Sequence, residues 1–491
     1  MPSNPIIPDQ TSLIPIAVAH GDGIGPEIMQ AVLRILNKAR APLDIRTVEI
    51  GEKCYLRGCN TGIDTDAWDT IRGSAAFLKA PITTPQGGGH KSLNVSLRTG
   101  LGLYANIRPC IAYSPYVATK HPNMDVVIVR ENEEDLYAGI EYHQTPEVCH
   151  SIKLISKPGS EKIIRYAFEY ARLHNRKKVT CFIKDNIMKI SDGLFQKTFQ
   201  RIKADYPNIE SNQMIVDIGA ARLADTPDIF DVIVMPNLYG DILSDVAAQI
   251  AGSVGLAGSA NIGIRCAMFE AIHGSAPDIA GKNIANPSGL LQAAVLMLNH
   301  LEQFACAEKI QNAWLVTLEE GIHTADIYKE GLSKQKVGTE EFANAVCARL
   351  GQKPKTFTAA TSAEHEKIIE VHPPHPHTTV RELIGVDCYI FAKSNPETVT
   401  NQLKNVKLPN GIKLSLITNR GGLIWPNGIP ETFCVDQWRA RFVMSAKGQA
   451  MSQEQILSIL HLLFANSIEL IRTENLYTFD GVAGYSSAEW S

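Results

Sequence analysis

The sequence has no cysteine pattern that would predict a disulfide framework or a zinc site. Its ten cysteines are scattered, without a Cys-x-x-Cys pair or a Cys/His cluster. No apolar run reaches membrane-spanning length. The first residues, MPSNPIIPDQTSLI, have neither the basic region of a signal peptide nor the arginine-rich character of a transit peptide. We therefore expect a cytoplasmic chain with reduced thiols (an organelle matrix would fit equally) behind a disordered lead-in.

The chain also lacks a strong excess of charge. Its 491 residues carry a net charge of −4, which gives no general attraction to nucleic acid or to a membrane, and we expect neither as a partner. Any anionic ligand must then be held by local basic residues. The length is sufficient for two or three domains with a large core.

The standard dinucleotide-binding fingerprint is missing as well. Ile14–Ala19 is a typical buried strand, and a glycine turn and an amphipathic helix, Ile28–Ala39, follow it. The turn reads GDGIGPE, with Pro26 where GxGxxG would have its third glycine. Either the turn binds phosphate or it is a tight strand-to-helix connection with proline in the first helical turn. A generic Rossmann dehydrogenase is disfavoured.

The most informative stretch that is present is Pro236–Gln249, PNLYGDILSDVAAQ. It follows the apolar run Asp231–Met235, which predicts a buried strand, and it has the residues of a helix. Asp241 and Asp245 are four residues apart and share one helix face, just beyond the strand end. Two carboxylates there suit Mg²⁺ or Mn²⁺. Alternatively, Asp241 only complements the helix N-terminus and Asp245 is solvated.

Three arginines at loop or strand ends indicate a site for a polyvalent anion. Arg98 follows the glycine loop 87–89, Arg108 comes next, and Arg130 ends the predicted strand Asp125–Val129. Guanidinium groups pair bidentately with carboxylates. Further polar candidates lie near these arginines or at other strand ends: Ser92, Asn94, Tyr137, Lys184, Asn186, and Asp217 at the end of a predicted strand 214–216.

The last third of the chain changes character. Residues 351–376 are rich in Lys, Thr, Pro and His, which predicts a linker, although the four histidines between residues 364 and 377 could also form a metal tract. Beyond the linker we expect a small domain with no catalytic constellation and a structural or assembly role. Its predicted elements are strands 385–392, 412–419 and 434–445, a helix 396–406, and a long helix 453–476.

Taken together, these motifs resemble the β-decarboxylating dehydrogenases, the family of isocitrate, 3-isopropylmalate, homoisocitrate and tartrate dehydrogenases. The resemblance covers about residues 13–350, and SLNVSLR is similar to isocitrate dehydrogenase in particular. It implies the α/β fold of isocitrate/isopropylmalate dehydrogenases, which is not a standard Rossmann fold. The small α+β C-terminal domain resembles the extension of a bacterial subgroup. The implied domains are a large cofactor-binding domain (13–104 and 260–350), a small substrate, metal and dimerisation domain (105–259), a linker (351–376) and a C-terminal domain (377–491).

The resemblance also implies site residues and a shared active site. Isocitrate would be held by Ser92, Asn94, Arg98, Arg108 and Arg130. Tyr137 and Lys184 would be the catalytic pair. The Mg²⁺ or Mn²⁺ ligands would be Asp241 and Asp245 of one subunit and Asp217 of the other, which would also supply Lys184. The working unit would be a homodimer or a higher homo-oligomer.

The implied reaction is oxidation of isocitrate and loss of CO₂ to give 2-oxoglutarate, with hydride passing to a nicotinamide cofactor. The cofactor residues would be Ile24, Thr83, Thr84, Asn186, His273, Gly274, Ser275, Ala276, Asp278, Ile279 and Asn286. NADP-dependent relatives carry Lys-Tyr after HGSAP, where this chain has Asp278-Ile279. A carboxylate can accept hydrogen bonds from both ribose hydroxyls of NAD and would repel a 2′-phosphate, so we predict NAD.

Three alternatives stay open. The first is an NADP-dependent isocitrate dehydrogenase, and the second is a homoisocitrate or 3-isopropylmalate dehydrogenase with the same chemistry. The third is a non-catalytic regulatory subunit. It is disfavoured because such subunits lose metal carboxylates or the catalytic tyrosine, whereas this chain keeps Tyr137, Lys184 and all three aspartates.

Overall fold

The structure is a computed structural model that describes residues 13–83, 92–361, 369, 371, 379–446 and 448–487. Thr84, the glycine loop 87–89, the four histidines between residues 364 and 377, and most of the lead-in lie outside the described residues. The chain divides into two compact units. The first comprises residues 1–138 and 154–373, and the second comprises 139–153 and 374–491.

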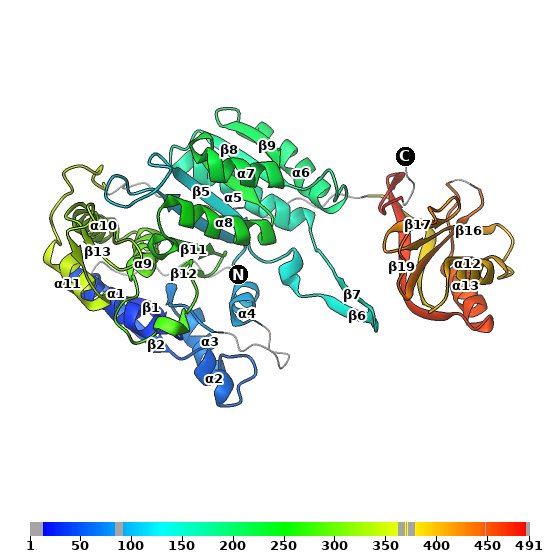
Figure 1. Ribbon diagram of the computed structural model, residues 1–491, viewed down its shortest axis with the longest axis horizontal. Helices are drawn as coiled ribbons and strands as arrows, with labels where there is room; N and C mark the ends of the chain where they lie inside the picture. The colour runs from blue at the N-terminus through cyan, green and yellow to red at the C-terminus, as the bar shows by residue number, and fades with distance from the viewer. Residues whose placement is uncertain are drawn as a thin grey trace, which may run out of the picture. The chain divides into compact units, whose positions relative to one another are not determined.

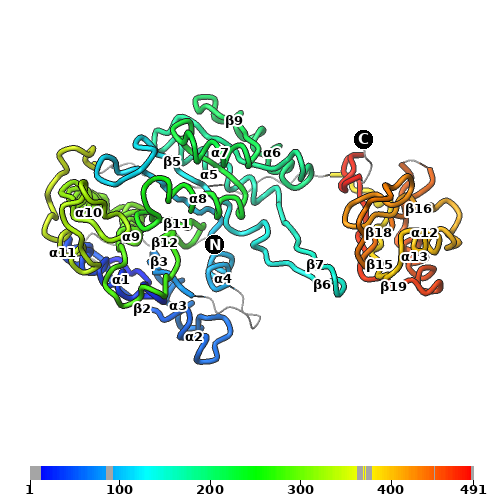
Figure 2. The backbone as a smooth tube through the Cα atoms, viewed as in Figure 1, coloured from blue at the N-terminus to red at the C-terminus, as the bar shows by residue number. Residues whose placement is uncertain are grey.

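The first unit is built on a sheet with ten strands among the described residues (Figure 1). In chain order they are β1 (Ile14–Ala19), β2 (Leu43–Val48), β3 (Ala76–Lys79), β4 (Ala105–Ile111), β5 (Asp125–Glu131), β8 (Lys178–Ile183), β9 (Glu210–Ile215), β10 (Val232–Met235), β11 (Gly258–Ile262) and β12 (Ala267–Ala271). Their order across the sheet is β2-β1-β3-β12-β11-β4-β5-β10-β8-β9. The late strand β12 returns beside the early strand β3, as the colours in Figure 2 show. The sheet is mixed, because β11 runs antiparallel to β12 and β4, and β4 runs antiparallel to β5.

Helices cover both faces of this sheet, which explains the unbroken apolar strands in the sequence. In β10, Val232 and Val234 join the core on one face, and Ile233 and Met235 join the core on the other. The helices are α1 (Gly25–Ala39), α2 (Glu52–Leu56), α3 (Thr65–Arg72), α4 (Leu93–Gly100), α5 (Lys157–Leu173), α6 (Ser191–Ile202), α7 (Val216–Asp225), α8 (Asn237–Ala251), α9 (Ser288–His300), α10 (Phe304–Glu319) and α11 (Thr339–Ala348). The short strands β13 (Ile322–His323) and β14 (Gln335–Lys336) pair with each other.

The α/β prediction is confirmed, and two strands, Ile14–Ala19 and Ile412–Asn419, have their predicted bounds. One local expectation is wrong. Asp217 does not end a strand, because β9 stops at Ile215 and Asp217 lies in the first turn of α7. A carboxylate is favourable there because a helix N-terminus carries partial positive charge.

The second unit contains a hairpin and a small sheet domain. The hairpin pairs β6 (Glu141–Thr145) with β7 (Val148–Ser151). The sheet has the order β17-β16-β18-β15-β19-β20, and both helices pack into the core on one face. Its elements are β15 (Arg381–Phe391), α12 (Pro396–Lys404), β16 (Ile412–Asn419), β17 (Gly422–Trp425), β18 (Gln437–Met444), α13 (Gln453–Ala465), β19 (Glu469–Phe479) and β20 (Val482–Ala483). Without the short strands β17 and β20, the element order is βαββαβ, which is that of ferredoxin-like domains.

The predicted helix 453–476 is wrong in its second half. The helix α13 ends at Ala465, and Ser467 has φ +58°, a left-handed conformation in which a helix does not continue. The chain then forms β19, which pairs with β15 along its whole length. Apolar residues on both sides of this break mimic a helical period in the sequence.

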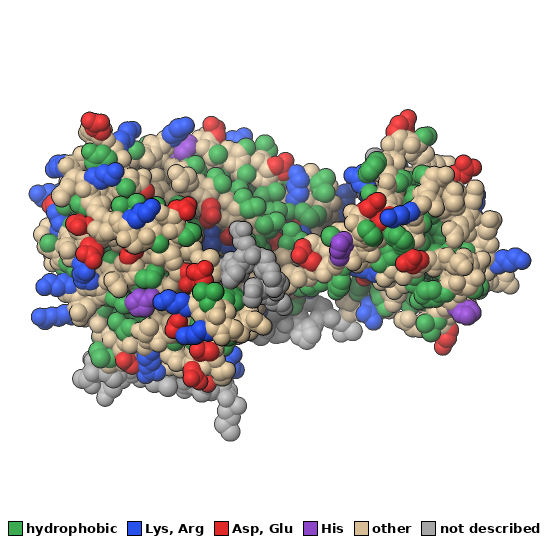
Figure 3. Space-filling view, turned by 60° about the horizontal axis from the view of Figure 1, so that its bottom comes forward, with side chains coloured by type: hydrophobic (Ala, Val, Ile, Leu, Met, Phe, Trp, Pro, Cys, Tyr) green, Lys and Arg blue, Asp and Glu red, His purple; other side chains and the backbone are tan. Residues whose placement is uncertain are grey.

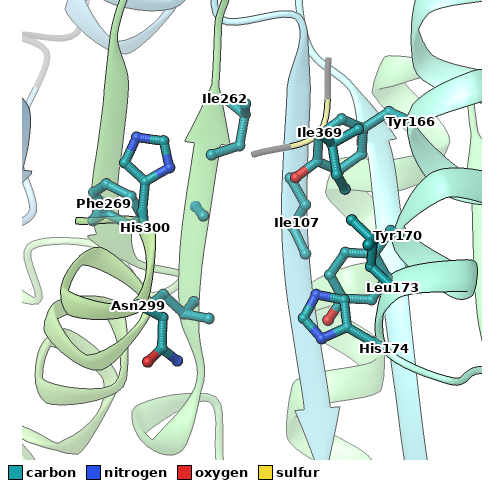
Figure 4. A pocket seen from close by; sticks show the side chains of 12 residues that line it. Ile107, Tyr166, Tyr170, Leu173, His174, Ile262, Phe269, Asn299, His300 and Ile369 are labelled. Atoms are coloured by element: carbon teal, nitrogen blue, oxygen red, sulfur yellow. The ribbon is translucent and has the colours of Figure 1, made fainter. Parts of the chain in front are cut away.

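The surface agrees with the small net charge. Basic and acidic side chains are interspersed with apolar ones on the face drawn in Figure 3. Within the part of the chain that the structure describes, no helix is both long and apolar enough to cross a membrane. All ten cysteines are free thiols. A hollow of about 110 Å³ lies over the sheet between α5 and α9 (Figure 4).

Candidate active site

A polar pocket of about 230 Å³ gathers most of the predicted substrate residues. It is lined by Lys79, Pro81, Ile82, Ser92, Asn94, Val95, Arg98, Arg108, Tyr137, Asp241, Glu270, Ala271, Ile272, His273 and Gly274. Segments far apart in sequence contribute these side chains. Ser92 is the N-cap residue of α4, while Asn94 and Arg98 lie within that helix. Tyr137 lies in a short 3₁₀ turn, η1 (Leu136–Ala138), and Asp241 lies in α8.

Asp241 is the centre of the ionic contacts in this pocket. One carboxylate oxygen accepts a hydrogen bond from Arg130, and the other accepts one from the hydroxyl of Tyr137. A nitrogen of Arg108 lies 3.5 Å from Asp241. Burial alone would raise the pKa of Asp241, but the charges of Arg130 and Arg108 outweigh it and lower the pKa. Asp241 is therefore ionised at neutral pH.

The guanidinium groups of Arg108 and Arg130 are buried and held by several partners. Arg108 donates to Asn106 at 2.6 Å and to Ser244 at 2.6 Å. Arg130 donates twice to the Oδ1 atom of Asn237, at 3.0 and 2.7 Å. Burial, together with repulsion from Arg98 and Arg108, lowers the pKa of Arg130 to about 9. The group is still a cation at neutral pH, and such crowding favours an anionic ligand.

Two polar atoms of helix α4, which borders the pocket, have no hydrogen-bond partner among the described residues. They are the Oδ1 atom of Asn94 and the Nε atom of Arg98, and both are buried. A buried donor or acceptor without a partner is costly. A bound ligand with carboxylate or hydroxyl groups would satisfy them, so the residues present fit such a ligand.

The pocket lining contains an ion pair that was not predicted from the sequence. The ammonium group of Lys79 lies 2.7 Å from Glu270, and Arg98 lies 3.2 Å from the same carboxylate. Burial alone would raise the pKa of Glu270, but Lys79 and Arg98 outweigh it and lower the pKa. The available signal was a single charge inside each of two otherwise apolar runs, AAFLKA and CAMFEAI. Buried charges are normally paired, so each predicted a partner.

The predicted metal ligands fall into two groups within one chain. Asp241 and Asp245 lie one turn apart on α8, with side chains 35% and 60% exposed. Asp217 instead pairs with Lys184 at 2.6 Å, and neither residue lines the pocket. Among the described residues, no three His, Cys, Asp or Glu side chains converge as a metal site. The oxygen donors of Asp241 and Asp245 suit Mg²⁺ or Mn²⁺, but the described part of one chain brings only these two together.

Several predicted cofactor residues lie together beside the pocket. The backbone N–H of Ile24 donates to the carbonyl of Ser275 at 2.8 Å, and the hydroxyls of Thr83 and Ser275 are 2.7 Å apart. Gly23 has φ +58°, and a Cβ there would lie 2.0 Å from the carbonyl oxygen of Ser275, so only glycine fits this approach. The Nε2 atom of His273 is buried without a partner among the described residues. This donor or acceptor fits a cofactor placed against the loop.

The other predicted cofactor residues are more dispersed. Asn286 donates to Asp326 at 3.0 Å, and Asp278 and Ile279 form part of the short turn η5 (Pro277–Ile279). Ala276 precedes this turn with φ +38°, and Gly274 lines the pocket. Asn186 is exposed on the loop after Lys184.

Comparison with known proteins agrees with this geometry. A model of the isocitrate/isopropylmalate dehydrogenase family matches residues 15–346, and a model of the bacterial isocitrate dehydrogenase C-terminal domain matches residues 381–490. The chain belongs to the isocitrate/isopropylmalate dehydrogenase family. Within it, the chain has the C-terminal domain of the bacterial subgroup.

Similar members of this family cover nearly the whole chain. A Rickettsia bellii protein named isocitrate dehydrogenase [NADP] is 52% identical over 97% of this chain and 99% of its own length. A Thermus thermophilus protein of the same name is 41% identical over 96% and 95%. A crystal structure of the TT0538 protein from Thermus thermophilus superposes with a TM-score of 0.90, at 40% identity, over 97% of this chain and 96% of that one.

These names contradict the prediction of NAD as the cofactor. The prediction depended on the carboxylate of Asp278, which is exposed on the surface. The ammonium of Lys282 donates to the main-chain carbonyl of Asp278 at 2.7 Å, so this loop carries both signs of charge. Water also screens an exposed carboxylate. The identity of residue 278 alone therefore does not determine whether this loop binds or repels a 2′-phosphate.

Proposed function

We propose that the chain is an NADP-dependent isocitrate dehydrogenase that oxidises isocitrate to 2-oxoglutarate and CO₂. The observation that carries the proposal is the pocket in which Arg98 and Arg108 face Asp241 and Tyr137, with Ser92 and Asn94 at one side. Arg130 does not line the pocket itself but donates a hydrogen bond to Asp241. The relatives that match the chain over nearly its full length are named for this activity.

The arginines would bind the α- and β-carboxylates of the substrate. Each guanidinium can form two parallel hydrogen bonds with a carboxylate, and burial strengthens these bonds. Ser92 and Asn94 would hold the third carboxylate. A trianionic substrate would also relieve the repulsion among the three guanidinium groups, which explains how a chain of net charge −4 binds it.

Asp241 and Asp245 would hold Mg²⁺ or Mn²⁺ next to the substrate hydroxyl and its neighbouring carboxylate. When bound, the ion would supply Lewis acidity, which makes the hydroxyl easier to deprotonate and favours the loss of CO₂. Burial raises the pKa of Asp245 and Arg108 lowers it in part, so a nearby cation would strengthen its ionised form.

Tyr137 would donate the proton that replaces CO₂ on the substrate. Burial, and then its hydrogen bond to Asp241, raise the pKa of Tyr137 above its ordinary value. The phenol therefore keeps its proton at neutral pH, as a general acid must. The aromatic ring lies under the Arg130 guanidinium, 4.9 Å from its central carbon to the ring centroid, which fixes its orientation.

A second copy of the chain would complete the site with Lys184 and Asp217. Apolar side chains next to both groups support a dimer. Ile218 beside Asp217 is 56% exposed, and Ile242 beside Asp241 is 55% exposed. Large apolar side chains exposed beside functional groups are typical of interfaces. The neutral amine of Lys184, formed when its ammonium group has lost a proton to solvent, would then take the proton from the substrate hydroxyl as hydride passes to NADP.

The test is an assay of the purified chain with Mn²⁺ and each cofactor in turn. We expect NADP reduction with isocitrate, formation of 2-oxoglutarate and CO₂, and little reaction with 3-isopropylmalate. Tyr137→Phe should reduce kcat by about a hundredfold or more. A wild-type protein that turns over 3-isopropylmalate faster than isocitrate, or that prefers NAD, would refute the proposal.

A further inference from the structure

A buried amide network lies beneath the pocket, where β4 and β11 pair. Asn106 and Asn261 are direct cross-strand partners, and both side chains are fully buried. The Oδ1 atom of Asn261 accepts a hydrogen bond from Asn106 at 3.0 Å and another from Asn132 at 3.0 Å. Its Nδ2 atom donates to Glu270 at 2.9 Å and to the carbonyl of Met268 at 3.3 Å. The hydrogen-bonding capacity of the Asn261 amide is thus fully used.

This network joins two arginines of the pocket. Glu270 accepts from Asn261 and from Arg98 on the same oxygen, Oε1. Asn106 donates to Asn261 and accepts from the Nε atom of Arg108. Hydrogen bonds therefore run without a break through Arg98, Glu270, Asn261, Asn106 and Arg108. Asn261 is the middle member, and it reaches both sides only because an amide donates and accepts at once.

We propose that Asn261 is a positioning residue, which sets the spacing of Arg98 and Arg108 for the carboxylates of the substrate. The inference depends on the proposed function for the identity of that substrate. Asn261 does not line the pocket. It acts through Glu270 on one arginine and through Asn106 on the other. A side chain that cannot donate would leave Glu270 held only by cations and would free Arg98 to shift.

Three variants test this assignment. Asn261→Asp keeps the shape and the acceptor but replaces the donor with a carboxylate beside Glu270. Asn261→Ala removes both functions. Asn312→Asp is the matched control, because Asn312 is also a buried amide, paired twice with the backbone of Ala360 and remote from the pocket. Calorimetry measures the affinity of each variant for isocitrate in the presence of Mg²⁺ and, in a separate titration, its affinity for NADP. Thermal melting measures stability.

We expect both Asn261 variants to weaken isocitrate binding by about ten- to a hundredfold, the usual effect of one unpaired buried polar group. NADP affinity should change less than about threefold, and KM for isocitrate should rise more than kcat falls. Asn312→Asp should melt earlier without losing isocitrate affinity. The double variant Asn106→Ala/Asn261→Ala should lose less binding free energy for isocitrate than the sum of the losses in the two single variants. Both residues act in one chain of hydrogen bonds, so removing the second one adds little.

Two results would overturn the inference, and neither is the failure of the proposed function. Asn261 variants that bind isocitrate as tightly as wild type would show that the amide only packs the sheet. Equal losses of isocitrate and NADP affinity would show general damage to the fold. A wild-type protein that binds no isocitrate would instead refute the proposed function, and it is recognised before any variant is compared.

Discussion

The ammonium group of Lys184 lies 2.6 Å from the carboxylate of Asp217, and this pair stands apart from the pocket that contains Tyr137 and Asp241. The contact with Lys184 lowers the pKa of Asp217. One chain therefore carries two incomplete groups of candidate residues, a lysine–aspartate pair and an arginine–tyrosine–aspartate pocket. If a second subunit brings them together, catalysis requires both copies.

Mixing two inactive variants tests this arrangement. Tyr137→Phe and Lys184→Met should each be nearly inactive as homodimers. Mixed dimers should have one site with both defects and one site with none, because the tyrosine and the lysine of a site come from different chains. Random mixing should restore about a quarter of the wild-type activity. The steady-state rate of the co-expressed pair, relative to wild type, measures this recovered activity.

The control is a mixture of Tyr137→Phe with Asp241→Asn, whose defects lie in the same pocket of one chain. Each pocket of its mixed dimers then carries one defect and none is intact, so this mixture should recover no activity. No recovery in the first mixture, with dimers verified by mass, would show that Tyr137 and Lys184 do not serve one shared site.

Gly240 is predicted to be indispensable for the position of Arg130. A Cβ at residue 240 would lie 2.5 Å from the Cγ atom of Arg130 and 2.7 Å from its Cβ atom. Gly240→Ala should therefore destabilise the fold by about 1–3 kcal/mol and weaken isocitrate binding, because Arg130 must move. Urea unfolding and calorimetry measure the two effects.

Gly193→Ala is the matched control, because Gly193 also lies in a helix but a Cβ there meets nothing within 4 Å. It should stabilise the protein by about 0.5–1 kcal/mol, the ordinary gain of alanine over glycine in a helix. If the two substitutions have the same effect on unfolding, the contact with Arg130 is not what restricts residue 240.

Local patterns were enough to predict much of the fold and of the pocket. The apolar run before Pro236 and the helix formers after it placed Asp241 and Asp245 correctly on one face of α8. Arg98 and Arg108 line the pocket and Arg130 is bonded to Asp241. Only Arg130 lies near a strand end as predicted, because Arg98 is inside α4 and Arg108 is in the middle of β4. The break at Ser467 was missed because one left-handed residue between two apolar segments leaves hardly any trace in hydrophobic periodicity.

Tertiary pairing was beyond local reasoning. Lys79 and Glu270 are far apart in the sequence, and only the parallel pairing of β3 with β12 sets them opposite each other. The same holds for Asn106 and Asn261, which meet through β4 and β11. Cofactor preference failed for another reason, since it depends on small differences in electrostatic energy at an exposed loop.

Asp278 is predicted to weaken NADP binding, although the chain is proposed to use that cofactor. Asp278→Asn should raise kcat/KM for NADP by about two- to tenfold, because a carboxylate near a 2′-phosphate costs about 1 kcal/mol at an exposed site. The kcat/KM for NAD should change less. Lys282→Gln should have the opposite effect, since it removes a cation from the same loop. Steady-state kinetics with both cofactors measure these ratios.

Asp228→Asn, an exposed carboxylate on the 3₁₀ turn 227–229, is the control for a general change in surface charge. This substitution should leave kcat/KM unaltered for both NADP and NAD. If Asp278→Asn behaves like Asp228→Asn, then the 2′-phosphate is not bound near this loop.

His174 is predicted to make the fold sensitive to mild acid. Its ring stacks on Tyr170, with centroids 4.0 Å apart, at the edge of the hollow in Figure 4. Burial, and then the charge of Arg176, lower its pKa from 6.5 to about 4. Between these values the unfolded chain binds a proton that the folded chain does not, so stability falls as pH drops from about 6.5 towards 4, by at most about 3 kcal/mol.

His174→Phe keeps a ring but cannot titrate, so its free energy of unfolding should vary less with pH over this window, whereas His121→Phe should follow wild type. Urea unfolding at several pH values measures the curves, and parallel curves for His174→Phe and wild type would contradict the prediction.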